Sequence, residues 1–274
     1  MATACLIVLL SGQLATAGSK LSGCISPPNR DCAIAIVSEY AETTPYAQDS
    51  AGLLAHVGAE LAKAGRLTAA DDAFSRAVEA AVTIESPTQS YSNLLAIARL
   101  QKLAGRNLAA QKTLSIAANV VLEEPHNVLG SLVTSQTMNL LGLAEEQRAV
   151  GDDTGAAETL AITAELAKTI DDARTRADQL ALVAAQQTLI ADQQEAADMN
   201  FAAARAAIAG IPELTLRAMH LASLARAQAE AGRTEVALAN IEQAYAISEE
   251  IAEPLDRGRL QAQIALTLLT FMAE

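Results

Sequence analysis

Apolar and small residues recur along this chain with the spacing of helix faces, and the pattern is interrupted at regular intervals. The stretch Leu224–Ala244 shows it most clearly: a helical pattern, a break at Gly232 and Arg233, and a second helical pattern. After the break, Ala237, Ile241 and Ala244 are four and then three residues apart, which places them on one helix face. The stretch therefore predicts a hairpin of two helices, called helix A and helix B below.

The same hairpin pattern occurs five times. The breaks at Gly65, Gly105, Gly151, Asp192 and Gly232 are separated by 40, 46, 41 and 40 residues, and a fixed period of this size is typical of stacked helical repeats. In helix B, equivalent apolar or small residues follow each break: Ala70, Phe74 and Ala77; Ala110, Leu114 and Ala117; Ala156, Leu160 and Thr163; Ala197, Phe201 and Ala204; Ala237, Ile241 and Ala244.

Helix A carries a pair of residues at a fixed distance before each break. The second member is always Gly or Ala, as close contact between helices requires. The pairs are Val57-Gly58, Ile97-Ala98, Leu143-Ala144, Ala184-Ala185 and Leu224-Ala225. We expect these pairs and the helix B residues to pack against each other.

Both ends of the repeat pattern carry an additional helix. Asn29–Thr43 predicts a helix B without its own complete partner, and Pro254–Glu274 predicts a final helix A. The apolar end of the latter, Leu266–Met272, is expected to pack on the last hairpin, the alternative being contact with a second copy or another protein. The connection Glu123–Ser131 carries the six additional residues of the longest period, and is either a protruding loop or an extended helix.

The spacing Val57-Gly58-x2-Leu61-x3-Gly65-x4-Ala70-x3-Phe74-x2-Ala77 resembles the tetratricopeptide repeat (TPR). The resemblance covers about Asn29 to the C-terminus. It departs from the family in lacking a Trp at the start of helix A and in a period near 40 residues, where the family has about 34. The resemblance implies an all-α fold, a right-handed TPR-like helix-turn-helix solenoid of about five to six helical hairpins over residues 29-274.

Composition agrees with an all-α fold and restricts the partners. The chain is rich in Ala, Leu, Glu, Gln and Ile, with no Trp and seven Pro, which favours helices over sheets. A net charge of −13 disfavours binding to nucleic acid and to anionic lipid. After the N-terminus, no apolar stretch reaches the roughly 20 residues that a membrane span needs.

The N-terminus resembles an export signal. The apolar run Ala2–Leu14 is followed by Ala15-Thr16-Ala17, a pattern of small residues at which signal peptides are cleaved. We therefore expect a signal peptide at residues 1-17, a linker at residues 18-28, and a periplasmic or secreted protein. Because Met1–Leu14 contains no Lys or Arg, a cytoplasmic location is the alternative.

The two cysteines that remain after cleavage, Cys24 and Cys32, could form a disulfide in an oxidising compartment. The alternative is two unpaired cysteines in a cytosolic protein. Leu21-Ser22-Gly23-Cys24 also resembles a bacterial lipobox, which would anchor the chain to lipid through Cys24, although the charge of Lys20 argues against it.

Motifs for catalysis, cofactors or metals are missing from the sequence. There is no glycine-rich phosphate loop, no nucleophile elbow and no zinc-hydrolase helix motif, and His56, His126 and His220 lie in different repeats. We therefore expect a protein that is not an enzyme and binds no cofactor or metal. The acidic stretch Gly151-Asp152-Asp153-Thr154-Gly155 is expected to provide the N-cap of the helix that follows it.

Three acids precede a base by four residues at the start of a helix A. An exposed pair in this order supports a helix by a few tenths of a kcal/mol. The predicted ion pairs are Asp172 with Arg176, Glu213 with Arg217, and Glu253 with Arg257.

The resemblance also implies where a partner would bind, because in TPR-like stacks the helix A faces line a concave groove for a peptide. By distance from each break, the groove residues would be Lys63, Arg99, Lys102, Arg148, Gln186 and Arg226, together with Leu95, Met138, Leu141, Glu145, Gln179, Leu182, Met219 and Glu230. Basic residues outnumber acidic ones in this set, which favours an acidic protein or peptide partner. The alternative is that these are ordinary solvated helix positions.

Two functions follow from this pattern. The first is a non-enzymatic protein-protein interaction scaffold that binds its partner in the concave face. The alternative is a self-assembling structural protein, a homo-oligomer formed through repeat edges and the apolar C-terminal helix.

Overall fold

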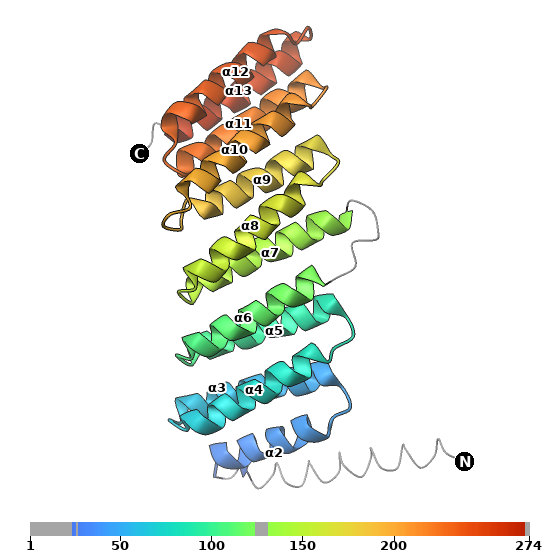
Figure 1. Ribbon diagram of the computed structural model, residues 1–274, viewed down its shortest axis with the longest axis vertical. Helices are drawn as coiled ribbons and strands as arrows, with labels where there is room; N and C mark the ends of the chain where they lie inside the picture. The colour runs from blue at the N-terminus through green and yellow to red at the C-terminus, as the bar shows by residue number, and fades with distance from the viewer. Residues whose placement is uncertain (1–23, 26, 124–130, 272–274) are drawn as a thin grey trace, which may run out of the picture. The chain divides into compact units, whose positions relative to one another are not determined.

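The structure, a computed structural model, describes residues 24–25, 27–123 and 131–271, and these residues form an all-α solenoid of helical hairpins (Figure 1). The chain has two compact units, Met1–Val120 and Val121–Glu274. The predicted signal peptide, Leu21–Gly23 of the lipobox-like motif and most of the connection Glu123–Ser131 lie outside the described residues.

The first unit contains one single helix and two hairpins. Helix α2 (Arg30–Thr43) is followed by the hairpins α3 (Ala47–Lys63) with α4 (Leu67–Val82) and α5 (Pro87–Leu103) with α6 (Asn107–Leu122), whose end lies at the unit boundary. Helix α3 packs against α2, α4 and α5. In Figure 1, α3 and α4 lie side by side and run in opposite directions.

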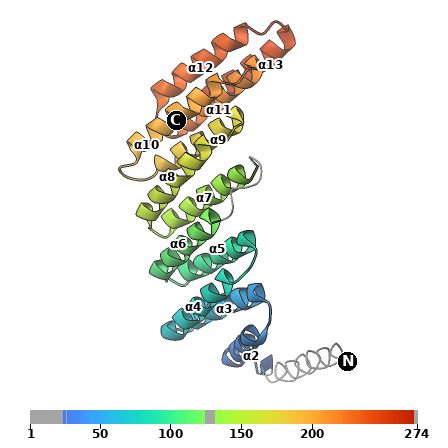
Figure 2. The same ribbon diagram turned by 45° about the vertical axis from the view of Figure 1, so that its right-hand side comes forward.

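The second unit contains three hairpins and a final helix. The hairpins are α7 (Ser131–Ala149) with α8 (Asp153–Lys168), α9 (Ala173–Gln187) with α10 (Gln194–Ala209), and α11 (Leu214–Glu230) with α12 (Thr234–Glu249), and α13 (Pro254–Phe271) follows. Each helix A packs on the next one, α7 on α9, α9 on α11 and α11 on α13. Figure 2 shows α11, α12 and α13 together from a second side.

Glycine turns close four of the five hairpins. Gly65, Gly105, Gly151 and Gly232 have φ angles of 71 to 78°, a region that glycine enters without a steric penalty. At the first turn, the N–H of Gly65 donates to the carbonyl of Ala62 and that of Arg66 donates to the carbonyl of Leu61. These two bonds satisfy the last carbonyls of helix A and end it.

The predicted packing positions of helix B form the core. All fifteen of these residues are buried, including Phe74, which is 1% exposed. Across the hairpin, Gly58 lies so close to the Phe74 ring that a Cβ at position 58 would be 3.0 Å from two ring carbons. Helix A therefore carries Gly or Ala at this position because the facing side chain of helix B leaves no room for a larger residue.

The predicted pair in the fourth hairpin is wrong by one residue. The buried pair is Val183 and Ala184, while Ala185 is half-buried. The reason is that α9 ends at Gln187 and a six-residue turn, 188–193, precedes α10. Asp192, with φ of 61°, occupies the position of the turn glycine. Because the turn before it is longer, the packing positions of helix A lie one residue further from Asp192 than predicted.

The two additional helices form where the sequence predicts them. The side chain of Asn29 accepts a hydrogen bond from the N–H of Cys32 and caps α2. In α13, Leu260 and Ile264 are buried and Leu268 packs on the core of the unit, but Leu266 and Leu269 are exposed. The apolar end of α13 is thus only partly covered. No helix within the described ranges is long and apolar enough to cross a membrane.

Candidate binding surfaces

The six predicted groove residues lie on five A helices, divided between the units. Lys63 ends α3, and Arg99 and Lys102 lie on α5, in the first unit. In the second unit, Arg148 lies on α7, Gln186 on α9 and Arg226 on α11. Each unit therefore has its own set of these residues.

Two of the cations are paired within their own helices. The Nζ of Lys63 lies 2.7 Å from Oε1 of Glu60, and hydrogen bonds from Lys63 and Arg30 lower the pKa of the Glu60 carboxyl. Arg226 lies 3.4 Å from Glu230. Because each charge already has a counter-charge, these positions attract an acidic ligand less than the sequence suggests.

Several other predicted groove residues hold helices together. Gln186 on α9 donates through Nε2 to the carbonyl of Leu141 on α7, at 3.2 Å, and Leu141 and Gln179 are themselves buried. The Nε of Arg148 is enclosed and has no hydrogen-bond partner within the described structure. The prediction that Leu141 and Gln179 face a groove is wrong, because both belong to the packing between A helices.

A few predicted apolar positions are exposed. Met138, Leu182 and Met219 lie on successive A helices and face solvent for 39 to 50% of their surface. Met219 and Arg226 also line a small hollow of about 150 Å³ between α11 and α13.

A second hollow lies on the helix B side of the second unit, between α8 and α10, and has a volume of about 600 Å³. Its lining includes Ala161, Ile162, Ala196 and Met199. The lining lysine, Lys168, is paired with Glu165 at 2.6 Å, so this hollow offers apolar contact and no unbalanced charge.

The hairpin α5/α6 has an unusual charge. Between Glu85 and Glu123 the chain contains no Asp or Glu, but it contains Arg99, Lys102, Arg106 and Lys112. Arg106 is bound to Asp71 of α4, with Nε 2.7 Å from Oδ1. Lys102 and Lys112 are exposed, and neither forms an ion pair in the part of the chain that is described. We call α5/α6 the acid-free hairpin.

Two leucines flank the turn of the acid-free hairpin. Leu103, the last residue of α5, is 81% exposed, and Leu108, near the start of α6, is 75% exposed. Lys102 is adjacent to Leu103, and Lys112 follows Leu108 by four residues on the same helix face. The tip therefore combines uncompensated positive charge with exposed apolar surface. An alignment of equivalent repeat positions does not indicate this charged and apolar tip. Its signal in the sequence is the absence of Asp and Glu between Glu85 and Glu123.

Buried polar bridges, which the hydrophobic pattern of the sequence did not predict, join the two helices of four hairpins. A glutamine near the end of helix A accepts a hydrogen bond of 2.6 to 2.9 Å from a Thr or Asn of helix B. The pairs are Gln101 with Thr113, Gln147 with Thr159, Gln187 with Asn200, and Gln228 with Asn240. Their signal in the sequence is a Gln followed by Thr or Asn after 12 or 13 residues.

Arginines that follow three of the turn glycines reach back to the preceding helix B. In all three cases the partner is an aspartate 35 residues earlier in the chain. The pairs are Arg66 with Asp31, Arg106 with Asp71, and Arg233 with Asp198. These pairs connect successive hairpins within each unit.

The predicted ion pairs at the start of helix A do not form. Arg176 instead donates to the carbonyl of Ile170 at 2.5 Å, and Arg257 to that of Ile251 at 3.3 Å, so both tie helix A to the residues that follow the preceding helix B. Asp172 caps α9 by accepting from the N–H of Thr175 at 2.8 Å. This bond and the side chains of Arg174 and Thr175 lower the pKa of Asp172 to about 2.

The acidic stretch at residues 151–155 caps α8 as predicted, and Asp152 is the capping residue, because its Oδ1 accepts from the N–H of Gly155 at 3.0 Å. The histidines are separate from one another: His56 is exposed, and His220 contacts Asp178 of α9 with Nδ1 2.9 Å from Oδ1. His126 lies outside the described residues. Within those residues, no three His, Cys, Asp or Glu side chains are grouped to hold a metal ion.

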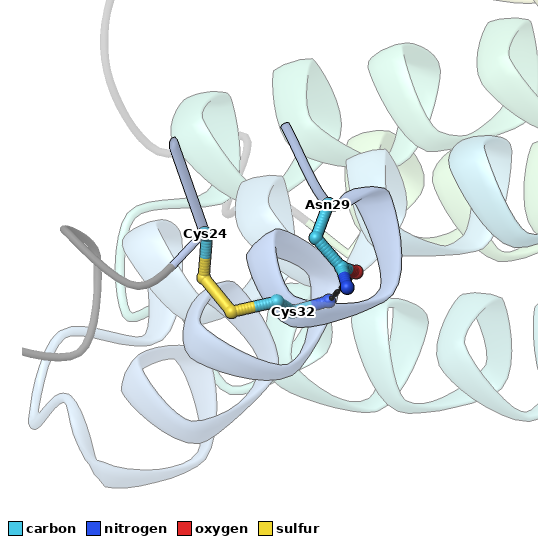
Figure 3. The surroundings of a disulfide bond; sticks show 3 residues. All are labelled: Cys24, Asn29 and Cys32. Atoms are coloured by element: carbon cyan, nitrogen blue, oxygen red, sulfur yellow. Dashed lines mark hydrogen bonds between the residues drawn. A yellow bond between two sulfur atoms is a disulfide. The ribbon is translucent and has the colours of Figure 1, made fainter. Parts of the chain in front are cut away.

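Cys24 and Cys32 are joined by a disulfide whose Cα atoms are 5.5 Å apart (Figure 3). Asn29 lies between them in the chain. Its side chain accepts from the N–H of Cys32 at 2.9 Å, and its own N–H donates to the carbonyl of Cys24 at 2.8 Å. The disulfide and these two bonds fix Cys24 at the first turn of α2.

Comparison with known proteins gives only distant likenesses. No protein-family model matches the chain, and no curated protein matches it. Among solved structures, Ton1535 from Thermococcus onnurineus NA1 has a TM-score of 0.38 at 15% identity, over 94% of this chain and 82% of that one. BtubC (BKLC) from P. vanneervenii has a TM-score of 0.37 at 16% identity, over 88% and 91%.

A third solved structure, the assembly chaperone of RpL4 (Acl4, residues 1–338), has a TM-score of 0.28 at 16% identity, over 93% of this chain and 95% of that one. At such TM-scores, none of the three assigns a function to this chain.

Proposed function

We propose that this protein is a non-enzymatic interaction scaffold that binds an acidic segment of a partner protein, and that the acid-free hairpin is its binding site. The observation that carries the proposal is the hairpin's charge: Lys102 and Lys112 are exposed and uncompensated in a protein with a net charge of −13. A local cluster of one sign dominates the field within a Debye length, about 8 Å at physiological salt. An acidic segment is therefore attracted to this hairpin.

The proposal selects Lys102 from the predicted groove residues. Lys63 and Arg226 are paired with Glu60 and Glu230, whereas Lys102 is exposed and forms no ion pair within the described residues. The exposed Leu103 and Leu108 add apolar contact area. An interface that combines apolar anchors with complementary charge gains both affinity and specificity.

We assign the repeats to a TPR-like class with a longer period. Three features support this: glycine turns with positive φ, the contact between Gly58 and Phe74, and burial of the Ala70, Phe74 and Ala77 positions. In this class the repeats serve as a rigid framework for binding, which fits a role without catalysis.

Charge reversal at the hairpin tests the proposed function. We expect the double substitution Lys102→Glu and Lys112→Glu to reduce the amount of partner protein captured from an extract of the source organism at least about tenfold, or ~1.4 kcal/mol. The matched control is Lys63→Glu with Lys168→Glu, which changes the net charge equally but replaces lysines that are already paired within their own helices.

Circular dichroism of all variants verifies that they fold, and quantitative mass spectrometry compares the captured proteins. Capture that is equal for the hairpin variant and the control variant would exclude the acid-free hairpin as the binding site.

We also propose that the protein is exported to the periplasm or secreted. The disulfide between Cys24 and Cys32 supports this, because disulfides persist in oxidising compartments. A disulfide also occupies the Cys24 sulfur that lipidation would need. The intact mass of the exported protein is expected to correspond to a chain starting at Gly18 with two hydrogens lost. A chain that still starts at Met1, or a mass increased by lipid, would contradict this.

Self-assembly is the second candidate function. It is favoured by the exposed leucines of α13, namely Leu255, Leu266 and Leu269, which a monomer leaves in contact with water.

A further inference from the structure

We infer that the acidic segment bound by the acid-free hairpin is residues 249–256 of a second copy of this chain. The inference rests on the proposed function, since it names the partner of the same binding site. It is carried by the match between two exposed surfaces of one molecule, one positive and one negative, each with a prominent leucine.

The positive surface is the tip of the acid-free hairpin. Leu103 and Leu108 are 81% and 75% exposed on either side of the turn, and Lys102 and Lys112 lie next to them along the chain and along the helix face. Apolar side chains that remain this exposed beside mobile, uncompensated ammonium groups form a surface with two modes of attraction.

The negative surface comprises the last residue of α12, the connection that follows it and the first turn of α13. Residues 249–256 read Glu-Glu-Ile-Ala-Glu-Pro-Leu-Asp, so half of them are acids. Ile251 is buried and anchors the segment, and Arg257 donates to its carbonyl. Glu250, Glu253 and Asp256 are exposed, and Leu255 between them is 81% exposed.

The two surfaces complement each other in charge and in apolar character. Leucines of the hairpin tip can contact Leu255 while Lys102 and Lys112 face Glu250 and Glu253. Desolvating the leucines strengthens the neighbouring charge pairs, because the effective dielectric constant falls as water leaves.

A contact between two unlike surfaces is heterologous. After one such contact, one copy keeps its free acidic segment and the other keeps its free hairpin tip, so further copies can be added head to tail. The net charge of −13 opposes association over long distances. The expected assemblies are therefore short, dependent on concentration, and dissociated by high salt, which screens the short-range pairs.

Reciprocal charge reversal in the full-length chain tests the inference. One variant carries Lys102→Glu and Lys112→Glu; the other carries Glu250→Lys and Glu253→Lys. We expect the native chain to associate in sedimentation velocity at moderate salt and each variant alone to be monomeric. An equimolar mixture of the two variants should associate again, because each hairpin tip then meets a segment of opposite charge on the other variant.

Controls with the same net charge separate specific pairing from general repulsion. They are Lys63→Glu with Lys168→Glu for the first variant, and Glu158→Lys with Glu195→Lys, two exposed acids of α8 and α10, for the second. Both controls should associate like the native chain. Association lost equally in the controls would overturn the inference, as would a mixture of the two variants that stays monomeric.

The inference and the proposed function can fail separately. A native chain that is monomeric at every concentration overturns the inference. If such a monomer captures a foreign acidic protein, and loses it with Lys102→Glu and Lys112→Glu, the proposed function stands. If the hairpin variant captures as much as its control, the proposed function fails as well.

Discussion

Replacing Phe74 with alanine is expected to lower the free energy of unfolding of the first unit by about 3–5 kcal/mol, the usual cost of removing a buried phenylalanine. Phe74 is 1% exposed and its ring lies against Gly58 of the facing helix. Alanine would leave a cavity between α3 and α4 that their backbones cannot fill, because the glycine has no side chain to move into it. Urea titration followed by circular dichroism measures the change.

A control in the same helix separates core packing from a general loss of apolar surface. Leu67 also lies on α4 but is nearly half exposed, so Leu67→Ala should cost less than about 1 kcal/mol. Gly58→Ala should destabilise by about 1–3 kcal/mol through overpacking, and less so when Phe74 is replaced by leucine. Equal costs for Phe74→Ala and Leu67→Ala would show that Phe74 is not the centre of this hairpin.

Replacing Gln187 with leucine is expected to destabilise the second unit by about 1–3 kcal/mol, because it leaves the amide of Asn200 buried without a partner. Gln187 and Asn200 are 1% and 6% exposed, and the bond between them is 2.9 Å long. Most of this loss of unfolding free energy comes from burying the Asn200 amide without a partner. Loss of the hydrogen bond itself contributes less, because in the unfolded state both groups bond to water instead.

The double substitution Gln187→Leu with Asn200→Leu distinguishes this cause from lost shape. If the unpaired amide is responsible, adding Asn200→Leu should recover much of the lost stability, giving a strongly non-additive cycle. Costs that simply add in urea titrations would mean that the two side chains do not act as a pair.

The features that sequence could predict are those set by helix geometry. Gly65 and its equivalents mark turns because other residues rarely adopt positive φ, and Ala70, Phe74 and Ala77 share a face because helices repeat every 3.6 residues. Such constraints act within a few residues and leave a periodic pattern. The displaced pair at Val183 and Ala184 was missed because Asp192 takes the glycine conformation while the turn before it is longer.

Features that depend on the partner across a helix interface were harder to predict. Gln187 looks like a solvated residue in its own helix, and its role is visible only beside Asn200. Likewise, the side chain of Arg176 does not pair with the acid four residues before it, Asp172. It donates to a backbone carbonyl, a group that every residue has. Lys63 and Arg226 were predicted to be free to bind an acidic ligand. A sequence shows which charged residues exist, but it does not show which side-chain rotamers bring opposite charges into contact.

The six-residue turn at 188–193 shows that hairpin tips tolerate changes in length. Although this turn is longer than the three-residue turns of its neighbours, α10 has 16 residues like the helix B of the other four hairpins, and Gln187 still meets Asn200. The alignment of the two helices is therefore set by their side-chain contacts, with the turn as a passive connector. Natural or engineered segments can accordingly be inserted at this tip, where the chain can acquire new contacts without a new fold.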